Sequence, residues 1–116
     1  IKERKQFGKI VGTFQALQHR AAHLYTETEL GRSIVLKSLQ ALDNAAPDAP
    51  LLVAAAQAKL GQGVQLAAKE AVQLHGGVGM TDAIDIGFFM KRARGAEMHL
   101  GDSNLHADRF ARMKGY

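Results

Sequence analysis

The stretch with the clearest chemical potential runs from Gln73 to Met80 and reads Gln-Leu-His-Gly-Gly-Val-Gly-Met. Its glycines, Gly76, Gly77 and Gly79, follow directly on a long helical pattern. Glycine adopts the left-handed backbone conformation that often ends a helix more easily than other residues do. A run of glycines also leaves backbone N–H groups open to a ligand. The pattern alone favours a helix C-cap followed by a loop, and it also permits a ligand to lie against the main chain.

A second candidate for chemistry lies near the N-terminus. Arg4 stands in a turn indicated by Gly8, where a guanidinium can present paired N–H donors to a pyrophosphate. The alternative is a surface arginine that pairs with Glu3. Basic residues cluster in two places, namely Lys2, Arg4, Lys5 and Lys9 and then Lys91, Arg92 and Arg94. Such clusters are typical of solvated basic faces or of sites for phosphate groups.

His19, His23 and Glu27 recur every four residues, so a helix would place them on one face. Zinc requires further ligands and supporting hydrogen bonds that nothing here specifies, so we interpret the three as exposed polar residues and predict no metal. The formal charge is +4, but the basic residues are mostly dispersed and aromatic residues make up only 6%. A nucleic-acid-binding surface is therefore not predicted.

The elements that must position these residues are helices. Apolar and small residues at spacings of three and four predict a first helix from Thr13 to Asp43, in which Gly31 marks a bend or a close approach of another helix. A second helix, with Asp48 as its N-cap, runs to about His75. The faces expected to point inward consist of Phe14, Leu17, Ala21, Leu24, Thr28, Gly31, Val35, Ser38 and Leu42, and of Val53, Ala56, Leu60, Val64, Ala67, Ala71 and Leu74.

Two further helices complete the predicted fold. The third has Thr81 or Asp82 as its N-cap, and the short fourth, with Asp102 or Ser103 as its N-cap, ends at Arg112. No segment alternates apolar and polar residues, so no strand is predicted. The expected architecture of residues 1–116 is all-α, an antiparallel four-helix bundle.

Composition excludes several classes of protein. The chain has no cysteine, so it has neither a disulfide framework nor a thiol nucleophile. No apolar run approaches the ~20 residues of a membrane span, and no signal-peptide pattern opens the chain. These features favour a cytoplasmic protein. Because the sequence starts at Ile1 and not at a methionine, we expect it to be a fragment of a longer chain.

Two motifs resemble the C-terminal domain of the acyl-CoA dehydrogenase family. The first is the Arg-x-x-Phe-Gly turn at residues 4–8, followed by Phe14-Gln15 at the start of a helix. The second is Gln-Leu-His-Gly-Gly-Val-Gly-Met-Thr at residues 73–81, and the similarity continues through residues 91–94 and 101–102. Both motifs have the order and spacing of the family, and the resemblance covers essentially all 116 residues.

The resemblance implies an FAD-dependent enzyme that forms a double bond between the α and β carbons of an acyl-CoA thioester. In the family, an N-terminal helical domain and a middle β-domain precede this region and hold most of the acyl-CoA contacts. Members are dimers or tetramers built through this helical domain. They usually pass electrons to an electron-transfer flavoprotein.

The resemblance also implies roles for particular residues. Arg4 would contact the FAD of a neighbouring subunit, and Gln73 would meet the nucleotide part of FAD. Gly76 and Gly77 would let the backbone approach the cofactor. The other cofactor-binding residues implied in this way are Gln6, Phe7, Phe14, Gln15, Asp102 and Asn104. Phe14 also lies on the apolar stripe and is expected to serve partly as core.

The catalytic base is the one role that the sequence leaves open. Many members place a glutamate directly before a glycine at the end of the third helix, where this chain has Leu100 before Gly101. Leucine cannot accept a proton. The base would then lie upstream of Ile1 or in a complete partner subunit; Asp102 is the nearest carboxylate, although its position matches a flavin contact. The alternative function is a non-catalytic scaffold or assembly subunit, or a partner subunit in a heteromer.

Overall fold

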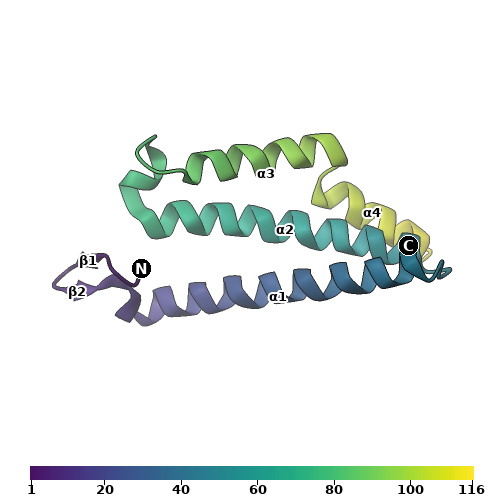
Figure 1. The fold of residues 1–116 in the computed structure, drawn as a ribbon, viewed down its shortest axis with the longest axis horizontal. Coiled ribbons are helices and arrows are strands. Elements are labelled where there is room, and N and C mark those ends of the chain that lie inside the picture. Colours follow the sequence, from purple (N-terminus) through teal and green to yellow (C-terminus); the bar gives the residue numbers. More distant parts are fainter.

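Four α-helices make up most of residues 1–116 in the computed structural model: α1 (Gln15–Asp43), α2 (Ala49–His75), α3 (Ile86–Leu100) and α4 (Ser103–Met113). A 3-10 helix η1 (Val11–Thr13) leads into α1, and a second, η2 (Gly76–Met80), follows α2. Helices α1, α2 and α3 run antiparallel along the long axis of a 56 × 27 × 27 Å molecule (Figure 1). The predicted all-α class is confirmed.

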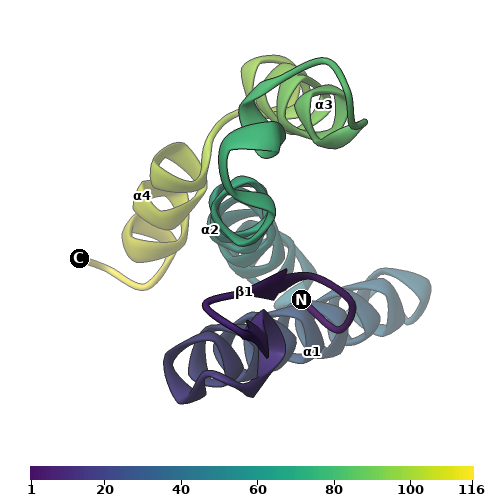
Figure 2. The ribbon, with the colours of Figure 1, turned by 90° about the vertical axis from the view of Figure 1, so that its left-hand side faces the viewer.

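The central element is α2, which packs against each of the other three helices (Figure 2). The buried residues in its contact with α1 are small. Ala54 and Ala56 are buried in α2, and Gly31 and Ser38 are buried in α1. A Cβ added to Gly31 would lie 3.4 Å from the Leu60 side chain, so Gly31 marks a close approach of two helices. Small residues at the contact allow short distances between helix axes.

Larger residues flank this contact and remain exposed, contrary to part of the predicted inward face. Leu42 is 54% exposed, and Leu60 and Val64 are each 40% exposed. Leu60 and Val64 do point toward α1, as predicted, but they line an open groove between α1 and α2 and stay partly uncovered. The prediction of an inward position was wrong for Leu42. No large side chain is fully buried, so the four helices alone leave much apolar surface uncovered.

Polar side chains tie neighbouring helices together. The Arg20 guanidinium of α1 donates to both carboxylate oxygens of Glu70 in α2, at 2.7 and 3.0 Å. The Glu27 carboxylate of α1 accepts from Lys59 of α2 at 2.6 Å. These pairs fix the register of α1 against α2. Glu27 is thus engaged by a lysine, and no cluster of three acidic or histidine side chains is placed to hold a metal ion.

Several boundaries differ from those predicted. Residues Lys5–Gln6 (β1) and Lys9–Ile10 (β2) pair as a small antiparallel hairpin, although no strand was predicted. Two-residue strands are too short to show alternation. Helix α3 begins at Ile86 with Asp85 as its N-cap, and not after Thr81 or Asp82. The Thr81 hydroxyl instead closes the preceding turn by donating to the Val78 carbonyl oxygen at 2.8 Å.

The remaining helix ends follow the prediction closely. Helix α1 starts at Gln15, two residues after the expected start, and α2 ends at His75. Asp48 occupies the N-cap position of α2 but makes no side-chain capping bond there. None of the helices combines the length and the hydropathy needed to cross a bilayer.

The Glu27–Lys59 pair predicts a pH dependence of stability. The hydrogen bond from Lys59 lowers the pKa of Glu27, with burial opposing the shift and charge attraction assisting it. A carboxylate with a lower pKa in the folded state stabilises the fold above its unfolded pKa of about 4.3 and loses that contribution as the pH falls through the folded value. Lys59→Met should therefore lower the melting temperature at pH 7, and its deficit should shrink below about pH 4.

Circular-dichroism melts from pH 7 to pH 3 measure this deficit. Lys69→Met, at an exposed position of the same helix, serves as the matched control. A deficit for Lys59→Met that is the same at every pH would show that the loss comes from packing and not from the ion pair.

Candidate functional site

The N-terminal hairpin presents an aromatic side chain under backbone strain. Phe7 and Gly8 form its two-residue tip with φ of 54° and 72°. Two-residue hairpin turns of this kind require positive φ at both positions and favour Asn-Gly, so phenylalanine here costs about 1–3 kcal/mol. Phe7 is 88% exposed, and its ring lies edge-to-face with Phe14 at 6.3 Å. Strain and exposure of an apolar side chain together are typical of residues that contact a ligand or a partner.

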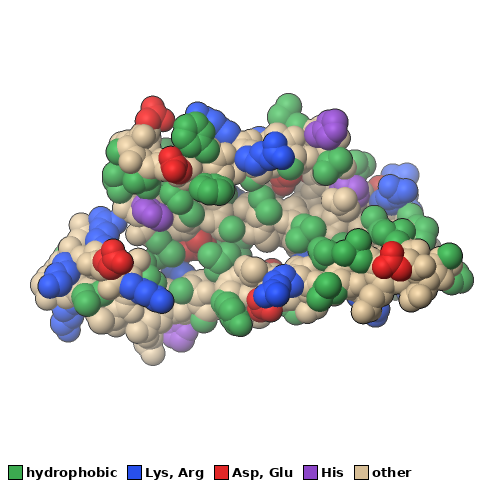
Figure 3. All heavy atoms as spheres, in the orientation of Figure 1, with side chains coloured by type: hydrophobic (Ala, Val, Ile, Leu, Met, Phe, Trp, Pro, Cys, Tyr) green, Lys and Arg blue, Asp and Glu red, His purple; other side chains and the backbone are tan.

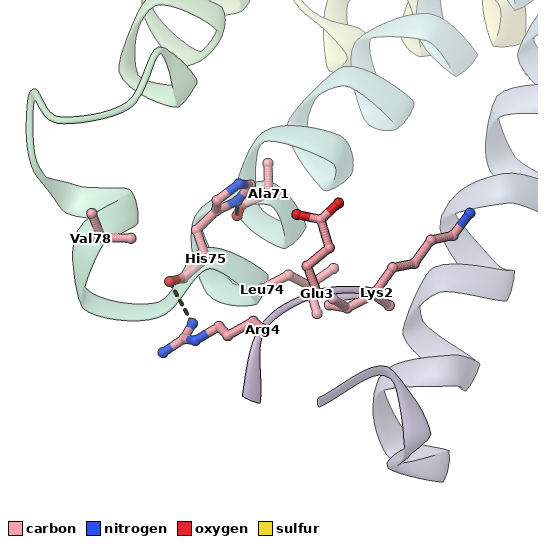
Figure 4. A pocket seen from close by; sticks show the side chains of 8 residues that line it. Lys2, Glu3, Arg4, Ala71, Leu74, His75 and Val78 are labelled. Atoms are coloured by element: carbon pink, nitrogen blue, oxygen red, sulfur yellow. Dashed lines mark hydrogen bonds between the residues drawn. The ribbon is translucent and has the colours of Figure 1, made fainter. Parts of the chain in front are cut away.

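Arg4 connects this hairpin to the end of α2. Its backbone oxygen accepts a hydrogen bond from the Val11 amide at 2.9 Å. Its side chain reaches across to α2, where Nη1 donates to the His75 carbonyl oxygen at 2.6 Å (Figure 4). A cation at the C-terminal end of a helix satisfies a free carbonyl and interacts favourably with the helix dipole. Residues 71 positions apart in sequence thus form one structural unit.

The end of α2 is shaped by its glycines. Gly76 has φ of 69° and ψ of −149°, a conformation open almost only to glycine. Gly79 is buried, and a Cβ there would lie 2.8 Å from the Val72 carbonyl oxygen. Around Gly77, in contrast, no heavy atom would lie within 4 Å of an added Cβ. The turn is therefore packed on one side by the protein and open at Gly77.

An open hollow of about 910 Å³ lies between the N-terminal segment and the last turns of α2. Its charged walls come from Lys2, Glu3 and Arg4 (Figure 4). His75 also lines it; its ring Nδ1 lies 2.7 Å from the Ala71 carbonyl oxygen, so this nitrogen donates. Two cationic side chains and one carboxylate line the hollow, which gives it a positive balance suited to an anionic ligand.

The predicted cofactor residues fall into two groups. The first group lies at the hairpin end of the molecule and comprises Arg4, Gln6, Phe7, Phe14, Gln15, Gln73, Gly76 and Gly77. The second group, Asp102 and Asn104, lies where α3 turns into α4, at the other end of α3 (Figure 1). The fifteen residues of α3 rise roughly 22 Å. One set of residues therefore borders the start of α3 and the other borders its end.

The turn between α3 and α4 is held by three features. Gly101 has a φ of 94°. Asp102, one of the two residues predicted for this role, is the N-cap of α4, and its Oδ1 accepts from the Leu105 amide at 2.8 Å. The buried His106 ring donates from Nε2 to the Leu100 carbonyl oxygen at 2.9 Å. Leu100 is 58% exposed, so the turn presents an apolar side chain and no carboxylate at this position.

Sequence reasoning missed two residues that contact this turn, His106 and Gly61. His106 reaches back six residues to a carbonyl group, a spacing with no periodic signature. Gly61 of α2 allows the first residue of α4 to sit against it, because a Cβ at Gly61 would lie 3.0 Å from that of Ser103. A glycine within a helical pattern was the one available signal for this contact.

Comparisons with known proteins identify the family of the chain. Residues 1–114 match the family described as acyl-CoA dehydrogenase, C-terminal domain. The chain therefore belongs to the acyl-CoA dehydrogenase family and corresponds to its C-terminal helical domain. No solved structure matches it significantly.

Named relatives support this assignment. The acyl-CoA dehydrogenase IpdE2 of Mycolicibacterium smegmatis is 37% identical over 86% of this chain and 30% of its own length. The mitochondrial short/branched chain specific acyl-CoA dehydrogenase of Bos taurus is 31% identical over 97% of this chain and 26% of its own length. A probable acyl-CoA dehydrogenase of Bacillus subtilis, YngJ, is 34% identical over 90% of the chain. The chain thus spans under a third of these relatives.

The N-cap bond of Asp102 can be tested by substitution. Asp102→Ala removes the acceptor of the Leu105 amide and should reduce the free energy of unfolding by about 1 kcal/mol. Asp102→Asn keeps a side-chain acceptor and should lie close to the original protein. Urea denaturation measures the free energy of unfolding of both variants. Asn104→Ala, at an exposed position two residues away, is the control. Equal stabilities of Asp102→Ala and Asn104→Ala would contradict the cap.

Proposed function

We propose that residues 1–116 act as the C-terminal helical domain of an FAD-dependent enzyme that oxidises the α and β carbons of an acyl-CoA thioester. The observation that supports this most is the junction of Arg4 with the last turn of α2, which unites both motifs in one positively balanced hollow. Most acyl-CoA contacts are assigned to parts of the protein outside these residues.

The first group of residues suits the dinucleotide part of FAD. Arg4 has five N–H donors, and its bond to His75 uses one of them. The others are available to phosphate oxygens. Phe7 supplies an exposed aromatic face near the same end, and Gly77 leaves the backbone open to close approach. When bound, FAD supplies the acceptor for the hydride that leaves the β carbon.

The second group, at the turn between α3 and α4, suits a different FAD molecule. The resemblance places Arg4 against the FAD of a neighbouring subunit, and α3, which rises roughly 22 Å, lies between the two groups. We therefore assign Asp102 and Asn104 to the cofactor of the chain's own subunit. FAD would then be bound between subunits of a dimer or tetramer. This arrangement requires the chain to associate before its cofactor sites are complete.

The general base lies outside residues 1–116 in this proposal. Leu100 offers no proton acceptor, and the Asp102 carboxylate already accepts a backbone N–H as the cap of α4. A carboxylate upstream of Ile1 would take the α proton, while Leu100 lines the acyl pocket. Electrons would pass to an electron-transfer flavoprotein.

A second candidate function follows from Leu100 alone. The chain would belong to a subunit without a base that works with a complete partner in a heteromer, or to a non-catalytic assembly subunit. The two proposals differ in a single observation. Flavoprotein purified without any partner would oxidise acyl-CoA in the first case and would not in the second.

The cofactor assignment predicts the effect of two substitutions in the complete flavoprotein. Arg4→Ala and Gln73→Ala should each weaken FAD binding, by roughly tenfold or more for the charged Arg4 and by less for Gln73, because each removes hydrogen bonds to the cofactor. Flavin absorbance after dilution and gel filtration measures occupancy, and circular dichroism verifies the fold. Lys37→Ala and Gln62→Ala, exposed on α1 and α2, are the matched controls. Full flavin retention in Arg4→Ala would refute the assignment.

The exposed apolar surface predicts self-association of residues 1–116. Hydrophobic side chains spread over the face formed by α1, α2 and α3 (Figure 3). Phe89, 69% exposed, borders an apolar groove between α2 and α3. Exposed apolar patches of this kind favour association. Sedimentation at micromolar concentration should show dimers or larger species, and Phe89→Glu should shift them toward monomer.

Gln62→Glu adds the same charge at an exposed polar position of α2 and should leave the association unchanged. A clean monomer of the unsubstituted chain at micromolar concentration would contradict this prediction.

A further inference from the structure

The space beside Gly76 is filled by the Arg4 guanidinium. A Cβ added to Gly76 would lie 2.7 Å from Nη1, 2.9 Å from Nη2 and 3.2 Å from Cζ of Arg4. The first two distances are shorter than van der Waals contact allows, so any side chain at this position would displace the guanidinium. Gly76 is the glycine of the motif against which Arg4 rests, since no heavy atom would lie within 4 Å of a Cβ at Gly77.

The backbone of Gly76 serves the same contact. With φ of 69° and ψ of −149°, the chain turns away directly after His75, whose carbonyl oxygen accepts the Arg4 bond at 2.6 Å. The Gly76 amide itself bonds back to carbonyl oxygens of α2, those of Gln73 and Val72. Gly76 therefore ends the helix and leaves room for the cation that satisfies its last turn.

We infer that Gly76 is a positioning residue for Arg4: its missing side chain seats the guanidinium against the end of α2 and so orients the remaining N–H donors toward the cofactor phosphates. The inference rests on the proposed function. The resemblance gives Gly76 a direct place beside the cofactor, as it does Gly77. The geometry instead gives the two glycines different roles, with Gly76 acting through Arg4 and Gly77 open to the ligand.

The two roles differ in how their substitutions combine with loss of Arg4. If Gly76 acts only through Arg4, Gly76→Ala costs FAD affinity when Arg4 is present and costs little once Arg4 is alanine. If a glycine touches the cofactor directly, its substitution costs the same in both backgrounds. Non-additivity of this kind identifies residues that act through one another.

The experiment is a double-mutant cycle on FAD affinity in the complete flavoprotein, measured by flavin fluorescence. We expect Gly76→Ala to weaken FAD by roughly tenfold, as expected for a disturbed charged hydrogen bond. In the Arg4→Ala background the same change should cost less than about twofold, whereas Gly77→Ala should cost a similar factor in both backgrounds. Gly115→Ala, at a position with a φ of 88° and no neighbour within 4 Å, gives the loss of melting temperature that a positive-φ alanine causes by itself, for comparison with that of Gly76→Ala.

Equal losses from Gly76→Ala in the two backgrounds would overturn the role of Gly76 while leaving the cofactor role of Arg4 intact. Unchanged FAD affinity in Arg4→Ala would count against the proposed function itself. If Gly76→Ala fails to fold, the Gly76→Ala/Arg4→Ala double variant decides the question. Recovery of folding there supports the steric contact with Arg4. Failure of both variants to fold would show that the backbone conformation of Gly76, and not the room it leaves for Arg4, requires the glycine, and would overturn the inference.

Discussion

The hydrogen bond from the Arg4 guanidinium to the His75 carbonyl oxygen is the contact on which the hairpin end of the structure depends. The hairpin residues are exposed, so no apolar core of their own holds them in place. Backbone hydrogen bonds also hold this segment. For example, the Val11 amide at the start of η1 donates to the Arg4 carbonyl oxygen. A charge-assisted bond to a helix end is stronger than a neutral one, and it places the cation at the negative end of the helix dipole.

The position of His75 depends in turn on the packing of α2. That helix has three neighbours and contacts them through alanine, glycine and serine. Bidentate pairing of Arg20 with Glu70, near the same end of the helix, sets how α1 lies along α2. The hairpin continues into α1 through η1, so the α1–α2 register decides whether Arg4 reaches its acceptor. Helix packing and site geometry are therefore a single problem in this chain.

The sequence predicted those features that arise from local pattern. Helix periods, the end of α2 at His75 and the cap at Asp102 all follow from residues close together along the chain. It could not reveal contacts between distant residues. Nothing local indicates that Arg4 fills the space beside Gly76, or that the His106 ring binds the Leu100 carbonyl oxygen.

The inward faces show a different limit of prediction. Periodicity gives the direction of a helix face but not how closely two helices approach. Leu60 and Val64 satisfy the pattern and point toward α1, yet they line an open groove between the two helices and stay partly exposed. The hairpin was not predicted because its two-residue turn contains Phe7. Such turns favour residues such as Asn at this position, so phenylalanine gave no sign of a turn.

Helix α3 contains no buried residue and yet separates the two groups of proposed cofactor residues. The length of α3, fifteen residues, therefore sets both the distance between the two groups and their relative rotation about the helix axis. Inserting one residue within it would turn the Leu100–Asp102 segment by about 100° and move it by about 1.5 Å along the axis. We therefore expect changes of length to be better tolerated between residues 81 and 85, where the backbone is not helical, than within α3.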